Sequence, residues 1–155
     1  SEINFYSCET EMHQGKPNDY FQFPTDILNK KFDGELALSK LQQYFAEENI
    51  GNALMEKSVF VGMGDLIRTE ALYRAKMHPD SLVRNIPEKK LIFLIISAVN
   101  FADELVEHFK NDEVNSKALI FEKKMCPKDK TEIQVDISTE TNGKIYICPK
   151  CQKLF

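Results

Sequence analysis

Apolar residues recur with the 3.6-residue period of an α-helix through the middle of the chain. The helices that this pattern predicts cover about residues 33–48, 52–57, 65–76 and 87–110. The last of them is apolar almost all round in its first half, because Ile92, Phe93 and Ile96 add to its main apolar stripe. A helix without a polar face is usually buried, so we expect this one in the centre of a helical bundle.

The two ends of the chain have a different pattern. Residues 131–138 alternate between apolar and polar side chains, and Asn142-Gly143 then predicts a hairpin turn that returns over residues 144–147. Residues 1–24 begin like a strand, whose partner lies either in a preceding sheet domain or close by in the chain. The predicted fold class is mainly α, with a helical bundle followed by a small β-hairpin subdomain.

The composition favours a folded protein with a core of its own. Hydrophobic residues make up 43% of the 155 residues and charged residues 28%. The longest apolar run, Leu91–Ile96 continued by Ala98 and Val99, is about half of what a bilayer span requires. The start has no signal-peptide pattern. We therefore expect no membrane association and an intracellular location, nuclear if the source is eukaryotic.

The net charge of −4 is unfavourable for a nucleic-acid-binding protein, so its distribution along the chain matters. Residues 1–50 contain 4 Lys and Arg against 9 Asp and Glu. Residues 62–90 contain 6 against 4, and residues 122–155 contain 7 against 5. We place nucleic-acid contacts in the two mildly basic segments. The acidic residues 1–50 are expected to face away from them or to bind a protein partner.

Two glycines precede the helix over residues 65–76, in the order Gly62-x-Gly64-Asp65. Glycine lets backbone approach a ligand closely, and the free N–H groups and dipole of a helix start attract anions such as a DNA phosphate. The alternative is a tight interhelical turn without a ligand. Asp65 favours this alternative, because it can cap the helix itself and its carboxylate would repel a phosphate.

Three of the four cysteines lie at the end of the chain, which in a reducing compartment favours a metal site over disulfides. The predicted ligands of one zinc ion are Cys126, Asp129, Cys148 and Cys151. Asp129 stands where a second cysteine would complete the first Cys-x2-Cys pair. A metal-free hairpin is the alternative, and completion of the site by His108 or Cys8 is a further one. The histidines form no catalytic arrangement.

Four segments carry a resemblance when their order and spacing are taken together. They are Asn52–Lys57, Val61–Asp65, Arg68–Pro79 and Tyr146–Lys153. This series resembles the C-terminal half of the formamidopyrimidine-DNA glycosylase and endonuclease VIII family, and residues 25–32 are most similar to its second endonuclease VIII-like type. The resemblance covers about residues 20–155. It implies a helix–two-turn–helix domain over 25–115, a zinc-finger-like hairpin over 116–155, and a strand remnant of an N-terminal sheet domain over 1–24.

The resemblance also implies a function. Family enzymes remove oxidised bases from DNA and cleave the abasic site, using an N-terminal proline amine in a separate sheet domain. This chain begins Ser1-Glu2-Ile3-Asn4 without such a proline. We therefore expect the catalytic half to be absent and the chain alone to be an inactive, monomeric part of a glycosylase that binds duplex or bubble DNA. The expected DNA contacts are Gly64, Asp65, Arg68 and Lys144, with zinc stiffening the hairpin.

Three positions depart from the family's pattern. Asp65 replaces a phosphate-binding asparagine, Gly143 stands in place of an arginine with Lys144 beside it, and Asp129 replaces a usual zinc ligand. Lysine lacks the bidentate fork of arginine, so DNA binding is expected to be weaker or altered. Two alternatives follow: a non-catalytic protein-interaction module, or an RNA-binding module that retains the fold.

Overall fold

The computed structural model describes residues 23–109, 117–137 and 143–155. The elements in chain order are α2 (Gly34–Tyr44), α3 (Ile50–Ala53), α4 (Asp65–Arg74), the 3₁₀ turn η1 (Val83–Asn85), α5 (Glu88–Phe109), β1 (Gln134–Ile137) and β2 (Lys144–Ile147). The predicted helices and hairpin are therefore present, with shorter bounds. The strand-like segment at the start of the chain and Asn142 lie outside the described residues.

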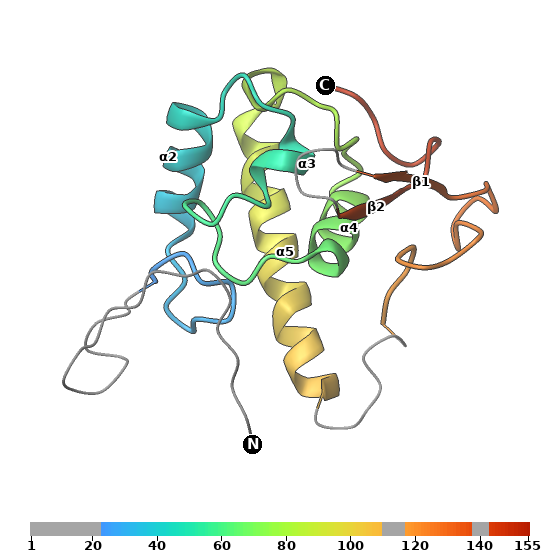
Figure 1. Cartoon of the computed structure of the whole chain (residues 1–155), viewed down its shortest axis with the longest axis horizontal. Coiled ribbons are helices and arrows are strands. Elements are labelled where there is room, and N and C mark those ends of the chain that lie inside the picture. The colour runs from blue at the N-terminus through green and yellow to red at the C-terminus, as the bar shows by residue number, and fades with distance from the viewer. Residues whose placement is uncertain (1–22, 110–116, 138–142) are drawn as a thin grey trace, which may run out of the picture.

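The long helix α5 forms the middle of the helical part, with α2 on one side and α4 on the other (Figure 1). Its buried face consists of Leu91, Leu94, Ile95, Ala98, Phe101, Ala102 and Leu105. The expectation that its first half is buried all round is wrong, because Ile92, Phe93 and Ile96 are 39%, 49% and 49% exposed. In the described part of the chain, α2 and α4 pack against this helix but do not cover the face that carries these three residues.

Helix α4 differs from the prediction at both ends. Gly64 is the N-cap and makes no side-chain cap bond, so Asp65 is the first helical residue and not the cap. At the other end, the N–H of Met77 donates to Leu72 O and that of Lys76 to Tyr73 O. This is a Schellman ending, in which Lys76 takes the left-handed conformation (φ 55°) that glycine usually adopts.

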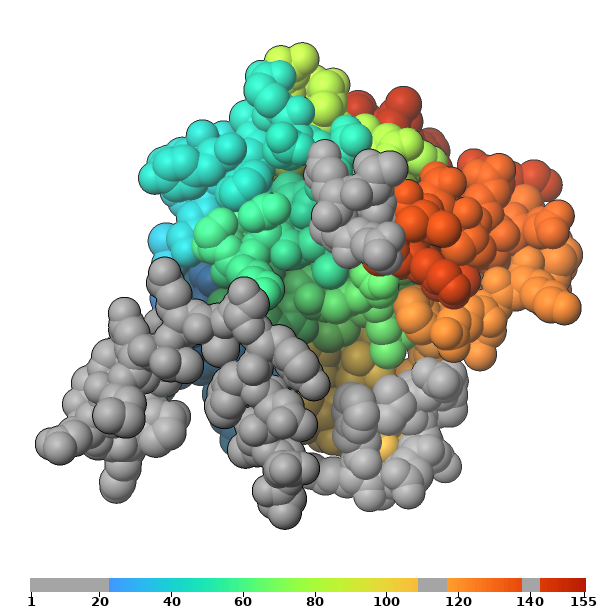
Figure 2. Space-filling view, viewed as in Figure 1, coloured from blue at the N-terminus to red at the C-terminus, as the bar shows by residue number. Residues whose placement is uncertain are grey.

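The β-hairpin is antiparallel and lies directly beside α4, and with residues 117–133 it forms a lobe at one edge of the molecule (Figures 1 and 2). All four residues of β1 are exposed, whereas Ile145, Tyr146 and Ile147 of β2 are buried. Ile145 and Ile147 belong to the same apolar core as the helices. The hairpin is thus packed onto the helical part, while Tyr146 belongs to a second buried cluster with Tyr73, Ile120, Cys126, Ile133 and Cys148. No helix in the described ranges is long and apolar enough to cross a membrane.

Candidate nucleic-acid interface and metal centre

The start of α4 is tied to the hairpin through Asp65. Its Oδ2 accepts a hydrogen bond from the backbone N–H of Lys144 at 2.9 Å, and its Oδ1 accepts one from Arg68 Nη2 at 2.9 Å. A carboxylate in the first turn of a helix is also favoured by the helix dipole. Asp65 therefore connects two segments that are far apart in the sequence, the helix start and the first residue of β2.

Arg68 is buried directly behind Asp65, with 1% of its surface exposed. Its guanidinium also donates to Lys144 O at 3.2 Å and to Gly51 O at 3.4 Å, while its Nε has no hydrogen-bond partner. Burial lowers the pKa of Arg68, and the nearby carboxylate of Asp65 raises it. The side chain joins α3, α4 and β2 and is not presented at the surface, where sequence reasoning had placed a DNA contact.

Gly143, which precedes β2, lies very close to the carboxylate of Asp65 at the start of α4. A Cβ atom there would lie 2.4 Å from Asp65 Oδ1, which is a steric clash. By contrast, a Cβ at Gly64 would meet no other described residue within 4 Å, so this side of the helix start is open in the described part of the chain. The side chain of Lys144 is exposed beside it. The structure therefore brings Gly64, Asp65, Arg68 and Lys144 together, with Gly64 and Lys144 accessible.

The four predicted metal ligands also come together. The Sγ atoms of Cys126, Cys148 and Cys151 and a carboxylate oxygen of Asp129 all lie within 4.8 Å of one another. Cys126 Sγ and Cys151 Sγ are 3.8 Å apart, and Asp129 Oδ2 is 3.2 Å from Cys151 Sγ and 3.6 Å from Cys148 Sγ. Zinc–sulfur bonds of about 2.3 Å in a tetrahedron separate two sulfurs by about 3.8 Å. The arrangement therefore fits a zinc ion held by three thiolates and one carboxylate.

Two tight turns present these ligands. In the first, Lys130 N donates to Cys126 O and Thr131 N to Asp129 Oδ1, with Lys130 in the left-handed region at φ 60°. In the second, the side chain of Gln152 accepts from Cys148 N at 2.8 Å and donates to Met77 O at 2.9 Å. The second turn is thereby fixed to the end of α4.

Local contacts affect the protonation of the four ligands differently. Burial raises the pKa of Cys148, and it raises the pKa of Cys151 to about 12. Burial also acts to raise the pKa of Cys126, but hydrogen bonds from Tyr73 and from backbone N–H groups outweigh it and the pKa is lowered. The backbone N–H of Thr131 lowers the pKa of Asp129. Without a metal, Cys148 and Cys151 are therefore thiols at neutral pH, and a metal must displace their protons.

Sequence reasoning missed Tyr73 as a neighbour of this cluster. Its hydroxyl lies 3.2 Å from Cys126 Sγ, and burial raises the pKa of Tyr73 well above its ordinary value. The hydroxyl is thus a neutral hydrogen-bond donor that can stabilise a thiolate. Its position two residues after Ala71, within the buried stretch Arg68–Tyr73 of α4, gave no signal in the apolar pattern. His108, in the last turn of α5, is not a member of the cluster.

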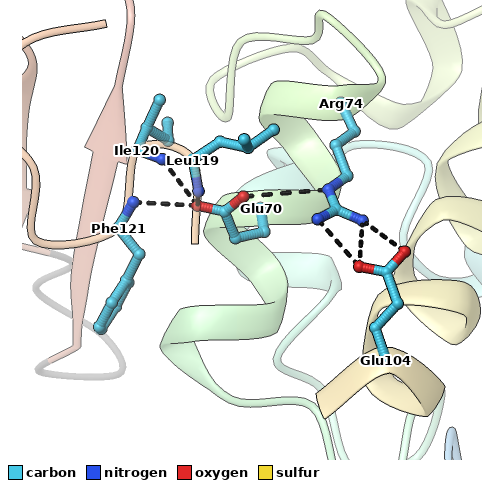
Figure 3. Close-up of polar contacts among 6 residues, drawn as sticks. All are labelled: Glu70, Arg74, Glu104, Leu119, Ile120 and Phe121. Carbon is cyan, nitrogen blue, oxygen red and sulfur yellow. Dashed lines mark hydrogen bonds and ion pairs between the residues drawn. The ribbon is translucent and has the colours of Figure 1, made fainter. Parts of the chain in front are cut away.

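Glu70 was also missed, and it makes a second connection between α4 and the lobe (Figure 3). Its carboxylate is fully buried, and Oε1 accepts from the backbone N–H groups of Leu119, Ile120 and Phe121 at 2.9, 2.8 and 3.0 Å. Its Oε2 lies 3.9 Å from Arg74 Nε. These three N–H groups compensate for the loss of hydration at the buried carboxylate. They fix the segment that leads into the metal cluster.

Arg74 continues this network toward α5 on the same side (Figure 3). It forms an ion pair with Glu104 at 3.2 Å, and its guanidinium carbon lies 4.3 Å from the centre of the Phe101 ring. A cation in this position is attracted by the face of the ring. Helix α4 therefore makes three contacts in succession along its axis. Asp65 contacts the first residue of β2, Glu70 contacts residues 119–121 of the lobe, and Arg74 contacts α5.

The described structure is a helical bundle with a glycine-preceded helix start beside a hairpin, and a cluster of three cysteines and one aspartate lies in the adjoining lobe. Residues 24–117 match the formamidopyrimidine-DNA glycosylase H2TH domain, and the chain belongs to this family.

Individual relatives agree with this assignment. The chain is 30% identical over 156 residues to the mouse (Mus musculus) protein Endonuclease 8-like 2, which covers 96% of this chain and 44% of the relative. The crystal structure of a viral DNA glycosylase is similar with a TM-score of 0.74 and 28% identity, covering 83% of this chain and 50% of the other. The formamidopyrimidine-DNA glycosylase of Lactococcus lactis is similar in fold, with a TM-score of 0.72, 21% identity and coverage of 83% and 49%. The chain thus spans about half the length of these proteins, or less.

Proposed function

We propose that this chain is the DNA-binding portion of a DNA glycosylase and AP lyase that acts on oxidised bases in base-excision repair. One observation carries the proposal: the open helix start at Gly64 lies beside the exposed Lys144. Asp65 holds the two together, because its carboxylate accepts a hydrogen bond from Lys144 N. The L. lactis relative was crystallised bound to DNA that contains an abasic site. Family membership and this shared fold support a DNA duplex as the ligand of the same surface.

In this proposal, DNA phosphates contact two kinds of donor. The backbone N–H groups at the start of α4 and the positive end of its dipole attract one phosphate. The ammonium group of Lys144 attracts a phosphate on the neighbouring side of the hairpin. Arg68 acts indirectly, because it holds Lys144 through the backbone oxygen and neutralises Asp65. Without that neutralisation, the carboxylate would repel the phosphate backbone.

A zinc ion fits the cluster of Cys126, Asp129, Cys148 and Cys151, and these residues are the ones that would hold it. When bound, such an ion crosslinks two turns and contributes folding energy to the lobe. Tyr73 keeps its hydroxyl against Cys126, and Gln152 holds the Cys148 turn on the end of α4. The chain's own residues therefore set the position of the hairpin relative to the helix start.

The test is the affinity of the 155-residue chain for a fluorescein-labelled duplex that contains a tetrahydrofuran abasic-site analogue. We expect binding that weakens by tenfold or more between roughly 50 and 200 mM salt, because each neutralised phosphate releases counterions. Affinity that does not change over this range would contradict the proposal. The same chain is expected to leave an oxidised-base or abasic duplex uncut, and strand cleavage by it would show that it carries catalytic residues of its own.

A further inference from the structure

The end of α4 and the beginning of α5 form a surface that the DNA-binding proposal does not use. A hollow of about 350 Å³ lies between them and is lined by Arg74, Ala75, Lys76, Lys89, Lys90 and Phe93. Phe93 is 49% exposed, and Ile96, one helical turn further along α5, is also 49% exposed. We call these residues with Ile96 the Phe93 surface. We propose that the Phe93 surface binds an acidic peptide segment of a protein partner, which inserts an apolar side chain beside Phe93.

The basic side chains of the Phe93 surface differ in whether they already have a partner. Arg74 is already engaged by Glu104 and by the ring of Phe101. The side chains of Lys76, Lys89 and Lys90 are exposed, and none of them is in an ion pair with another residue of the described ranges. Three cations around one hollow can therefore accept carboxylates from outside.

The backbone adds to this positive potential. Lys89 and Lys90 lie in the first turn of α5, a helix of 22 residues whose N-terminal end carries a positive partial charge. Lysine is unfavourable at that position for the helix itself, because like charges repel. The two side chains and the helix end together attract anions, although the net charge of the whole chain is −4.

The exposed apolar side chains favour a peptide over other anions as the ligand. A phosphate or a nucleic-acid backbone would gain nothing from Phe93 and Ile96, whereas an apolar side chain of a peptide would bury both. The volume of the hollow is at the small end for ligand sites and suits one anchoring side chain. Aromatic side chains are enriched at the centre of protein interfaces, and polar groups form the rim around them. Phe93 with the three lysines at its edge has this arrangement.

The location separates this surface from the proposed DNA contacts. Gly64 and Asp65 begin α4, whereas Arg74 ends it ten residues later. A helix rises about 1.5 Å per residue, so about 15 Å lie between the two ends. A partner on the Phe93 surface can therefore bind without displacing a ligand from the helix start.

The experiment measures anisotropy of a fluorescein-labelled twelve-residue peptide that consists of Glu and Asp around a central Phe-Leu pair. We expect the 155-residue chain to bind it at low salt, and Phe93→Ala to weaken binding by about tenfold or more through loss of buried apolar area. The double variant Lys89→Glu/Lys90→Glu should weaken it by at least the same factor. The matched control is Lys30→Glu/Lys31→Glu, which reverses two adjacent exposed lysines elsewhere and should retain binding apart from the general charge effect.

Four results would overturn the proposal. Equal binding of a peptide without the Phe-Leu pair, or equal binding by Phe93→Ala, would mean simple ion exchange. Loss of affinity for duplex DNA in Phe93→Ala would make the surface a nucleic-acid contact. A dimer in sedimentation velocity that Phe93→Ala disperses would make a second copy the occupant. Since Phe93 is half exposed, both variants should keep the circular dichroism spectrum of the parent chain, which shows that lost binding is not lost folding.

Discussion

Helix α4 holds the lobe through two acidic residues that lie in different environments. Asp65 is about one-third exposed and contacts a guanidinium and one backbone N–H group. Glu70 is fully buried and contacts three consecutive backbone N–H groups. A buried carboxylate without its partners costs several kcal/mol, whereas a partly exposed one can be rehydrated. Glu70 is therefore expected to contribute mainly to the free energy of unfolding, and Asp65 mainly to the affinity of the proposed DNA-binding surface.

The largest effect is expected from Glu70→Ala. It leaves the backbone N–H groups of Leu119, Ile120 and Phe121 without their acceptor, and that of Ile120 is buried, so the free energy of unfolding should fall by about 3 to 5 kcal/mol. Urea denaturation followed by circular dichroism measures this. Glu104→Ala is the control, because it removes an exposed partner of the same network and should cost less than about 1 kcal/mol. Equal losses in the two variants would contradict the assignment of stability to Glu70.

Zinc binding should depend strongly on pH. Cys148 and Cys151 have raised pKa values and must each release a proton when a metal binds, so the apparent affinity should fall as pH falls. Each released proton corresponds to about a tenfold loss of affinity per unit of pH, so Cys148 and Cys151 alone give at least about a hundredfold loss for each unit below neutrality. Competition with a chromophoric chelator at two pH values measures this. The variant Cys151→Ser releases one proton fewer, so the slope of log affinity against pH should fall by about 1.

The metal-free chain should respond to pH in the opposite direction. The pKa of Cys151 is raised to about 12 in the folded protein, above the ordinary value of 9.0. Its contribution to stability is therefore complete below pH 9 and is lost as the pH rises toward 12. Thermal unfolding in the presence of a chelator should show a falling midpoint above pH 9. In Cys151→Ser this part of the decline should be reduced, and an unchanged decline would exclude Cys151 as its source.

Asp65→Asn is expected to have a smaller effect that separates binding from stability. The amide oxygen can still accept from Lys144 N, and the charge that repels a phosphate is gone. The amide nitrogen then takes the place of Oδ1 and faces the guanidinium of Arg68. We expect DNA affinity to rise by about tenfold at low salt. Arg68 loses its charge partner at the same time, so stability should fall by about 1 to 2 kcal/mol. Unchanged affinity would mean that Asp65 does not face the DNA.

The smallest effect is expected from Lys144→Ala. If its ammonium group contacts one phosphate, the slope of log affinity against log salt should decrease by about 1. Stability should change by less than about 0.5 kcal/mol, because the contacts to Asp65 and Arg68 involve only the backbone of this residue. Lys30→Ala is the control and should leave the slope as it is.

The sequence allowed the helices, the hairpin and the metal cluster to be predicted, because each depends on periodicity or local spacing. The helix over residues 65–76 and the return strand over 144–147 were found close to their positions. Cys126, Asp129, Cys148 and Cys151 were found from the two turns that flank the hairpin. The family follows from the same motifs in order.

The remaining features depend on contacts between distant segments, which local patterns do not encode. Exposure of Phe93 depends on which helices cover α5, not on its own apolar pattern. Burial of Arg68 depends on the approach of β2, and the role of Glu70 on residues 119–121. The backbone conformation also shows that Gly64 is the N-cap of α4 and that Asp65 is its first helical residue, which the sequence pattern did not indicate.

The clash between a side chain at position 143 and the carboxylate of Asp65 has a consequence for how relatives of this chain can diverge. A larger residue at 143 is tolerated only after residue 65 has moved or shortened its side chain. While position 143 is glycine, the carboxylate can keep its present place and its bond to Lys144 N. The two sites should therefore change as a pair during evolution, and one order of substitution passes through a less stable intermediate than the other.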